Sequence, residues 1–297
     1  MAVTMMCQDW ESSFSNFRAP VENSVISELC RDEETEVIEF LSARPIHTVF
    51  MTGLIRDNGM LSPRNRGSFY GSRNNRGQLD GVALIGHATL VEARTENSLK
   101  AFACVARNCR NAHLIRGEQS AVKTFWQYYA GAGREPRQIC RELMFEMKKA
   151  PAADHVADLR PATVNELEKV VAVNSAMAFE EAGINPLQRD PNGFRNRTAR
   201  RIEKQRVWVV FEDNRLIFKA DVVSETPQVS YLEGIYVHPE ERGQGHGSRC
   251  LRKLCSQLLN RSQSLSVTVN YQNKRATAFY EKAGFEHHSD YETIYLR

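Results

Sequence analysis

The sequence predicts an α/β protein with an α+β mixed sheet, divided into two domains. In both halves, short apolar runs typical of strands alternate with amphipathic stretches typical of helices. Residues 148–155 are small and polar, as linkers usually are. The length of 297 residues suits two domains of ordinary size. We therefore expect a loose N-terminal leader over 1–24, one domain over 25–150 and a second over 155–297.

The composition is that of a globular protein, with 42% hydrophobic and 25% charged residues. A net charge of +3 is too small to indicate nucleic acid, and no apolar run is long enough for a membrane helix. No secretory signal pattern opens the chain. Seven cysteines without a CxxC pair favour reduced thiols over disulfides or a zinc site. We therefore expect a cytoplasmic protein that uses no metal, nucleic acid or membrane; its oligomeric state stays open.

The elements of the first half follow from its apolar spacing and its turns. Apolar residues over 25–41 suit one or two helices, and residues 46–55 predict a strand. Two stretches around the polar turn Asn74–Gly77 predict a hairpin of strands at 69–73 and 81–91. The remaining elements expected here are a strand at 101–106, a helix over 118–129 and a strand at 143–147.

The second half opens with Thr163–Glu166, a capping-box pattern that predicts the start of a helix. A second helix is expected over about 194–205. A turn at Asp213–Asn214 joins strands into a hairpin. The elements expected after it are, in order, a strand at 229–237, a helix over 248–259, a strand at 265–270, a helix over 274–283 that Gly284 stops, and a strand at 291–296.

A glycine-rich turn follows the strand that ends before Pro239. Glycines alternate at 243, 245 and 247, and an amphipathic helix begins directly after them. Alternate glycines allow backbone N–H groups to point into one concavity, and the helix adds its positive N-terminal end. The turn therefore predicts a phosphate or pyrophosphate site, with Arg242 adding charge. The Rossmann and P-loop patterns both fail here, because the required last glycine and the Gly-Lys pair are missing.

The pattern Arg-x-x-Gly-x-Gly from Arg242 to Gly247 resembles the acetyl-CoA signature of the GCN5-related N-acetyltransferase (GNAT) superfamily. The block from Asn273 to Phe285 is similar to the family's closing motif, in which an Asn, a small residue, a Tyr and a Gly-Phe follow a strand. Two ordered motifs at the family spacing are more specific than one glycine cluster. The resemblance covers about 155–297.

The resemblance implies acetyl-CoA as the co-substrate and assigns the residues that bind it. Main-chain groups near Ile235, Tyr236 and Val237 would pair with the pantetheine arm, and Asn273 would contact the same arm. The residues implied to hold the pyrophosphate are Arg242, Gly243, Gln244, Gly245, His246, Gly247 and Ser248.

The resemblance also suggests the catalytic residues. Tyr280 would be the general acid for the leaving thiolate, although an aromatic on a short helix is also a common core residue. Glu233, directly or through a water, would be the base; the alternative is a carboxylate facing solvent. Glu180 and Glu181 would bind a cationic amine, or they form a solvated turn.

The first half resembles a second, degenerate GNAT unit. Its glycine signature is missing between Val105 and Ala121, where Arg116–Gly117 alone remains. A tandem arrangement with one silent half follows from this resemblance. The N-terminal half would then shape the acceptor cleft or pack against its partner, and it would not bind CoA.

These observations favour an N-acetyltransferase that moves an acetyl group from acetyl-CoA directly to a small-molecule or peptide amine. Direct transfer is expected because no cysteine falls within the motifs to carry the acyl group. Two alternatives remain: a non-catalytic acyl-CoA-binding or sensing protein, and an aminoacyl or longer-acyl transferase. The sequence does not identify the amine.

Overall fold

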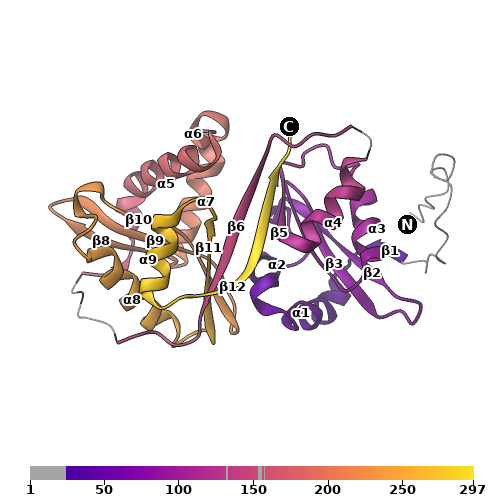
Figure 1. The fold of residues 1–297 in the computed structure, drawn as a ribbon, viewed down its shortest axis with the longest axis horizontal. Helices are drawn as coiled ribbons and strands as arrows, with labels where there is room; N and C mark the ends of the chain where they lie inside the picture. The colour runs from indigo at the N-terminus through magenta and orange to yellow at the C-terminus, as the bar shows by residue number, and fades with distance from the viewer. Residues whose placement is uncertain (1–24, 132, 153–155, 157) are drawn as a thin grey trace. The chain divides into compact units, whose positions relative to one another are not determined.

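The computed structural model describes residues 25–131, 133–152, 156 and 158–297, and these form two compact units (Figure 1). Unit 1 comprises the described residues up to Glu142 together with Asp290–Arg297, and unit 2 comprises those from Leu143 to Ser289. Each unit mixes strands and helices, so the predicted α/β class is confirmed. The predicted leader, 1–24, lies outside the described residues.

The main elements of unit 1 are, in order, β1 (Val25–Glu28), α1 (Glu34–Ser42), α2 (Pro45–Asn58), β2 (Gly67–Arg73), β3 (Leu79–Gly86), β4 (Ala88–Ala93), α3 (Glu96–Ala106), β5 (Leu114–Glu118), α4 (Gln119–Ala130) and the first part of β6 (Gln138–Met147). The strand order includes β1-β2-β3-β4-β5-β12. Strands β4 and β5 pair in parallel, over Ala88–Leu90 and Leu114–Arg116. The last part of β12 (Glu286–Tyr295) lies antiparallel to β5, with Tyr291 opposite Glu118. The end of the chain therefore adds a strand to unit 1.

Two strand predictions in this unit are wrong. Residues 46–55 lie in α2, which begins with Pro45 in its first turn, a position that favours helix starts. Residues 101–106 end α3, whose start is capped by the Thr95 side chain, accepting from Ser98 N. Short apolar runs do not separate buried helix from buried strand. In addition, residues 25–28 form β1 where a helix was expected.

The main elements of unit 2 are, in order, the last part of β6, β7 (Arg160–Pro161), α5 (Leu167–Ala182), α6 (Pro186–Arg189), α7 (Pro191–Glu203), β8 (Val207–Glu212), β9 (Arg215–Glu225), β10 (Val229–Val237), α8 (His246–Leu258), β11 (Ser264–Asn270), α9 (Lys274–Ala283) and the start of β12. The predicted capping box at Thr163–Glu166 is present ahead of α5. Asp213 and Asn214 have positive φ, as a tight hairpin turn requires. Gly284, with φ +102°, ends α9 as predicted.

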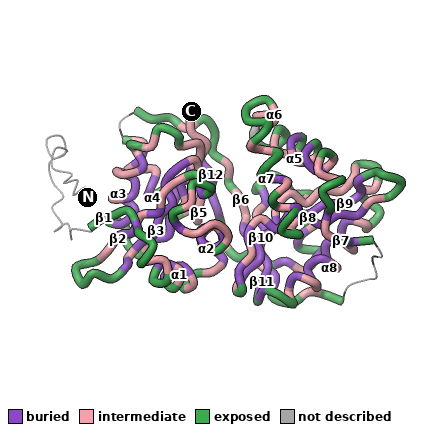
Figure 2. Tube along the Cα trace, turned by 180° about the vertical axis from the view of Figure 1, so that it is seen from behind, coloured by how far each residue is buried: buried purple, intermediate pink, exposed green. Residues whose placement is uncertain are grey.

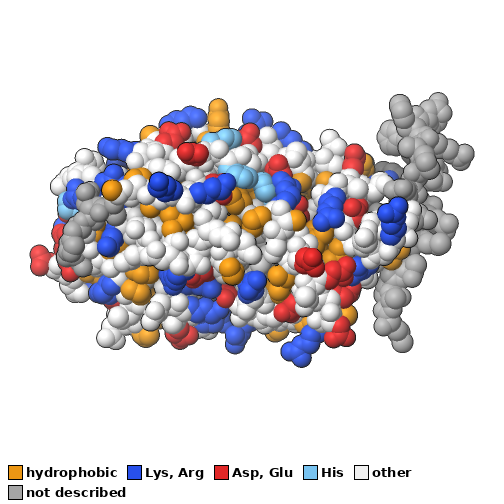
Figure 3. All heavy atoms as spheres, turned by 90° about the horizontal axis from the view of Figure 1, so that it is seen from below, with side chains coloured by type: hydrophobic (Ala, Val, Ile, Leu, Met, Phe, Trp, Pro, Cys, Tyr) orange, Lys and Arg blue, Asp and Glu red, His pale blue; other side chains and the backbone are white. Residues whose placement is uncertain are grey.

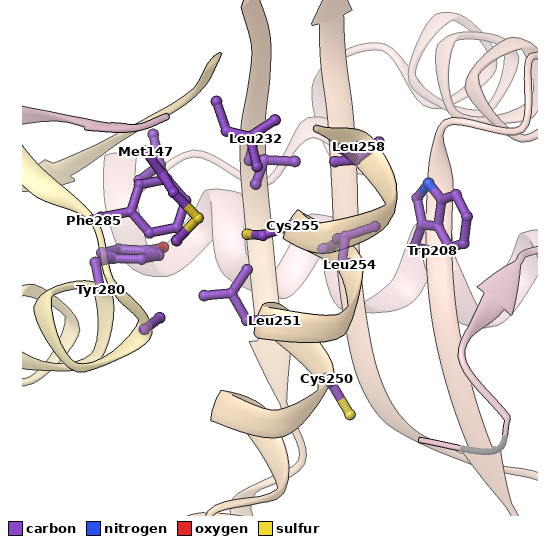
Figure 4. Close-up of a cluster of buried hydrophobic side chains, with 14 of the residues drawn as sticks. Met147, Trp208, Leu232, Cys250, Leu251, Leu254, Cys255, Leu258, Tyr280 and Phe285 are labelled. Carbon is purple, nitrogen blue, oxygen red and sulfur yellow. The ribbon is translucent and has the colours of Figure 1, made fainter. Parts of the chain in front are cut away.

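The sheet of unit 2 carries helices on both faces. Its strand order includes β6-β11-β10-β9-β8-β7. Strands β10 and β11 pair in parallel, whereas β9 pairs antiparallel with both β8 and β10. On one face, Leu251, Leu254 and Leu258 of α8 pack into a core that also holds Leu232 of β10. Figure 4 shows α8 between Trp208 on one side and Tyr280 with Phe285 on the other. On the other face, residues of α5 and α7 pack on β8 and β9, and purple buried segments fill the interior in Figure 2.

The two units share one order of elements. Apart from the short α6, each runs strand, two helices, three strands, helix, strand, helix, strand. The chain passes between the units inside β6 and again inside β12. The linker expected at 148–155 rests on local composition. Composition does not show which strands pair with one another, and the division into units depends on that pairing.

No helix of the described residues is long and apolar enough to cross a membrane. In Figure 3, basic and acidic side chains are interspersed over the face in view.

Candidate active site

The site is built around the point where β10 separates from β11. Their parallel register runs from Val229–Ser264 to Leu232–Val267, although β10 continues to Val237 and β11 to Asn270. Within the described residues, the β10–β11 ladder ends there. The main chain of Ile235, Tyr236 and Val237 therefore has an edge outside this ladder, which an extended ligand can approach.

A β-bulge lies at the same point of β10. Glu233 pairs with Asp221, and Tyr236 pairs with Lys219. Two residues of β10, Gly234 and Ile235, therefore lie opposite one residue of β9, Ala220. Gly234 has φ +58°, a left-handed conformation that glycine adopts without strain. Bulges redirect the backbone and the adjacent side chains, and the half-buried Glu233 is the last regularly paired residue before this bulge.

The glycine turn connects β10 to α8. Gly243 and Gly245 have φ of +82° and +80°, and Gly245 is the N-cap of α8. Gly245 has no side chain to cap the helix, and no side-chain cap is found among the described residues, so the first N–H groups are left for a ligand or solvent. A Cβ added at Gly243 would meet nothing within 4 Å, whereas one at Gly247 would lie 2.6 Å from Val237 Cγ2. The turn is thus open on its surface, and α8 is packed tightly on the end of β10.

Side chains hold this turn in place. Arg242 Nε donates to the Val237 carbonyl at 2.9 Å, and Gln244 Nε2 donates to the Glu240 carbonyl at 2.9 Å. Arg215 of β9 pairs with Glu240 and, at 3.0 Å, with Glu241. Arg242 is exposed, so its charge stays at the surface of the turn. His246 and Ser248 are the first and third residues of α8.

Tyr280 lies on the buried side of α9. Its ring contacts the rings of Phe145, Phe279 and Phe285 (Figure 4 shows it beside Phe285). Burial raises the pKa of Tyr280 above its ordinary value, and the charges of Glu181 and Glu233 raise it further. Both carboxylates therefore lie within electrostatic reach of a phenol that stays protonated.

Asn273 is the N-cap of α9, and its Oδ1 accepts from Ala276 N at 3.0 Å. Glu180 and Glu181 are exposed near the end of α5. Burial raises the pKa of Tyr236; the charge of Glu180 acts in the same direction, and Arg242 opposes it. The end of α5 therefore lies within electrostatic reach of both Tyr236 and Tyr280.

The sequence reasoning missed a cluster of polar residues on the α5–α7 face. Lys219 and Asp221 of β9 are buried and paired, and Arg201 of α7 also contacts Asp221. The signal that could have found it is the pair of charges at alternate positions of an otherwise apolar strand, where buried charges need partners.

The two cysteines of α8 are buried in the core. Burial raises the pKa of the Cys250 thiol to about 11, and it raises the pKa of Cys255 as well. A thiol that stays protonated is a poor nucleophile.

The matching position of unit 1 differs from the glycine turn. There the parallel pair β4–β5 leads to Thr95, whose side chain caps α3. The comparable turn is therefore Arg94–Thr95. The prediction that the turn would lie between Val105 and Ala121 is wrong, because residues 101–106 belong to α3. Arg44 contacts Glu92 of β4 at 3.1 Å and Glu118 of β5 at 2.7 Å, which ties the ends of these strands together.

Comparisons with known proteins agree with this geometry. The model of the acetyltransferase (GNAT) family matches residues 175–285. A curated relative, thialysine N-epsilon-acetyltransferase of Bos taurus, is 46% identical over 55 residues. Those residues are 18% of this chain and 32% of that protein, so the chain matches about a third of the relative's length.

Solved structures extend the likeness of fold over most of the chain. A GNAT-family acetyltransferase from Colwellia psychrerythraea has a TM-score of 0.55 at 12% identity, covering 92% of this chain and 100% of its own. A tandem GNAT protein from the clavulanic acid biosynthesis pathway has a TM-score of 0.57 at 14% identity, covering 92% and 98%. Residues 175–285, which lie in unit 2, therefore match the GNAT family, and the fold over most of the chain is similar to that of a tandem GNAT protein.

Proposed function

We propose that unit 2 transfers an acetyl group from acetyl-CoA directly to an amine. The observation that carries this proposal is the end of β10: its backbone leaves the β11 ladder and leads into a helix whose N-terminus no side chain caps. Such a strand edge suits the amide-bearing arm of CoA, and the helix start suits its pyrophosphate. Glu233 lies on this strand, and its charge reaches Tyr280.

The donor would be held mainly by backbone groups. Main-chain groups of Ile235, Tyr236 and Val237 would pair with the pantetheine arm, and residues from Arg242 to Ser248 would surround the pyrophosphate. The open surface at Gly243 supports this fit, because a side chain there would fill the space. The side-chain oxygen Oδ1 of Asn273 already accepts from Ala276 N, which leaves the side-chain N–H₂ for the cofactor arm. Acetyl-CoA supplies the activated thioester.

Glu233 is proposed as the base, directly or through a water. An ammonium group has no lone pair, so the acceptor must lose a proton before it attacks. Tyr280 is proposed as the acid that returns a proton to the thiolate. Its raised pKa keeps the phenol protonated, as an acid must be before it acts.

Glu180 and Glu181 are proposed to attract the cationic form of the acceptor. Their exposure leaves them accessible, and their charges reach Tyr236 and Tyr280. The curated relative is named for acetylation at the ε-nitrogen of thialysine, which supports an acceptor with a side-chain amine. Direct transfer is favoured because the thiols of Cys250 and Cys255 have raised pKa values, which makes them poor acyl carriers.

A CoA-release assay over a broad panel of amines tests the proposal. Turnover with at least one amine is expected, and Gly245→Glu should abolish it. That change puts a carboxylate at the helix start, where it repels the pyrophosphate, and a side chain on a residue with φ +80°. Retained acetyl-CoA binding without turnover of any amine contradicts the proposal and favours an acyl-CoA sensor.

A further inference from the structure

A charged cluster lies buried beside the β10 bulge, on the face that α5 and α7 cover. Lys219 is fully buried, and its Nζ lies 2.7 Å from Asp221 Oδ1. Arg201 Nη1 lies 2.8 Å from the other oxygen of that carboxylate, which Asn174 Nδ2 approaches at 3.5 Å. Asp221 is thus shared between two cations.

The Lys219 ammonium lies against the backbone of the bulge. A Cβ added at Gly234 would be 2.8 Å from Lys219 Nζ and 3.4 Å from Asp221 Oδ2. In the β9–β10 register, Tyr236 is opposite Lys219 and Glu233 is opposite Asp221, so the four side chains share one face of the sheet. The cluster and Glu233 therefore lie on the same face of the sheet, at neighbouring positions of β9 and β10.

A buried ion pair is weak evidence for a role in stability. Burying two charges costs free energy that their attraction often fails to recover, and apolar replacements are frequently neutral or stabilising. Burial lowers the pKa of Lys219, whereas the charges of Asp221 and Glu233 favour its ammonium form and Arg201 disfavours it. The position of the cluster at the bulge indicates a role in the site.

We propose that Lys219 is a positioning residue: held by Asp221, its ammonium fixes the backbone around Gly234 and places a positive charge beside the Glu233 carboxylate. This inference rests on the proposed function. Lys219 is too deeply buried to touch a substrate, so it acts through Glu233. The other titratable groups around Glu233 are Asp221 of β9, Arg201 of α7, Glu181 of α5, Tyr280 of α9 and Tyr236 of β10.

Lys219→Met tests the proposal, since it removes Nζ and keeps most of the side chain. The turnover number should fall about 10- to 100-fold, while the KM for acetyl-CoA stays within about twofold. The acidic limb of the pH–rate profile should move up by about one pH unit, because losing a nearby positive charge disfavours the carboxylate base. Lys219→Arg keeps the positive charge, so the acidic limb of its pH–rate profile should return to the position seen in the parent protein. Lys169→Met is the matched control, because Lys169 contacts the Asn214 carbonyl at the β8–β9 turn, and it should leave both quantities unchanged.

A slower Lys219→Met enzyme with an unmoved acidic limb overturns the proposal. A second measurement needs no turnover: the unfolding temperature of Gly234→Ala in the parent and in the Lys219→Met background. The added methyl group should lower the unfolding temperature less where Nζ is gone. If Gly234→Ala lowers the unfolding temperature equally in both backgrounds, the contact between Lys219 and the Gly234 backbone is refuted. If the protein acetylates no amine but Gly234→Ala still lowers the unfolding temperature less in the Lys219→Met background, the proposed function is wrong and the contact between Lys219 and Gly234 is supported.

Discussion

Glu233 is the residue on which proton removal depends in the proposed reaction. It stands at a bulge, next to the end of the β10–β11 ladder, and opposite a buried ion pair. Glu233→Gln keeps the shape of the side chain but removes the proton acceptor. Turnover should therefore fall about 10²- to 10⁴-fold. Acetyl-CoA affinity, measured by calorimetry, should stay nearly unchanged.

The matched control is Glu212→Gln, which neutralises an exposed carboxylate at the end of β8 in the same sheet. It should leave turnover unchanged. A Glu233→Gln variant as active as the parent would remove Glu233 from the role of base.

Tyr280 is predicted to stay protonated throughout the neutral range. Burial and two nearby carboxylates raise its pKa above the ordinary value of about 10. Turnover should therefore show no loss from Tyr280 ionisation as pH rises through 8 and 9, because the phenol still carries its proton there. Tyr280→Phe should lower turnover while keeping the ring contacts and the unfolding temperature.

The pH–rate profile and the thermal unfolding of Tyr280→Phe check this prediction. Tyr128→Phe, which removes a hydroxyl that contacts Glu96 in unit 1, is the control and should leave turnover unchanged. If Tyr280→Phe retains full turnover, the ring is a core residue alone.

At the scale of elements, α9 begins at Asn273, which has both a structural and a proposed binding role. Its side chain caps the helix through Ala276 N. Asn273→Ala should cost about 1 kcal/mol of unfolding free energy, because a capping hydrogen bond is lost. Asn273→Asp keeps the cap and adds a negative charge that suits a helix start. Denaturant unfolding of both variants measures the difference.

The same pair separates the two roles. An Asp variant with normal stability but weaker acetyl-CoA binding is expected if Asn273 also contacts the cofactor arm. An Ala variant as stable as the parent would contradict the capping role.

The sequence predicted unit 2 better than unit 1, and the reason is local. Strand 229–237 and helix 274–283 have the predicted bounds, because turns and caps in the sequence mark their ends. In unit 1, residues 46–55 and 101–106 were too short and apolar for periodicity to separate a buried helix from a strand.

Within the site, the glycine turn was visible in sequence because it depends on residue type at fixed spacing. The Lys219–Asp221–Arg201 cluster was not, because it joins a strand to a helix through tertiary contact. The β10 bulge was hidden for the same reason, since register depends on the partner strand.

At the scale of the whole molecule, the two units share an element order but differ at the helix start that would bind a donor. In unit 1 the Thr95 side chain caps α3, whereas Gly245 leaves α8 uncapped. Acetyl-CoA should therefore bind with a stoichiometry of one per chain, measured by calorimetry. Gly245→Glu should abolish that binding entirely, and a residual site in this variant would place a second donor site elsewhere in the chain.

The last residues of the chain, Asp290–Arg297, are predicted to stabilise unit 1, although the rest of that unit ends at Glu142 in the sequence. Ile294 of β12 is buried in a core with residues of β3, β4, α3, β5 and α4, and it lies opposite Ile115 of β5. Ile294→Ala should cost about 2–5 kcal/mol of unfolding free energy, because it leaves a cavity in that core. Hydrogen exchange should then rise in β3–β5, α3 and α4, while β8–β10 keep their protection. Arg297→Ala, which removes an exposed ion pair with Glu135, should change neither. Equal loss of protection in β8–β10 would show that the two units unfold as one.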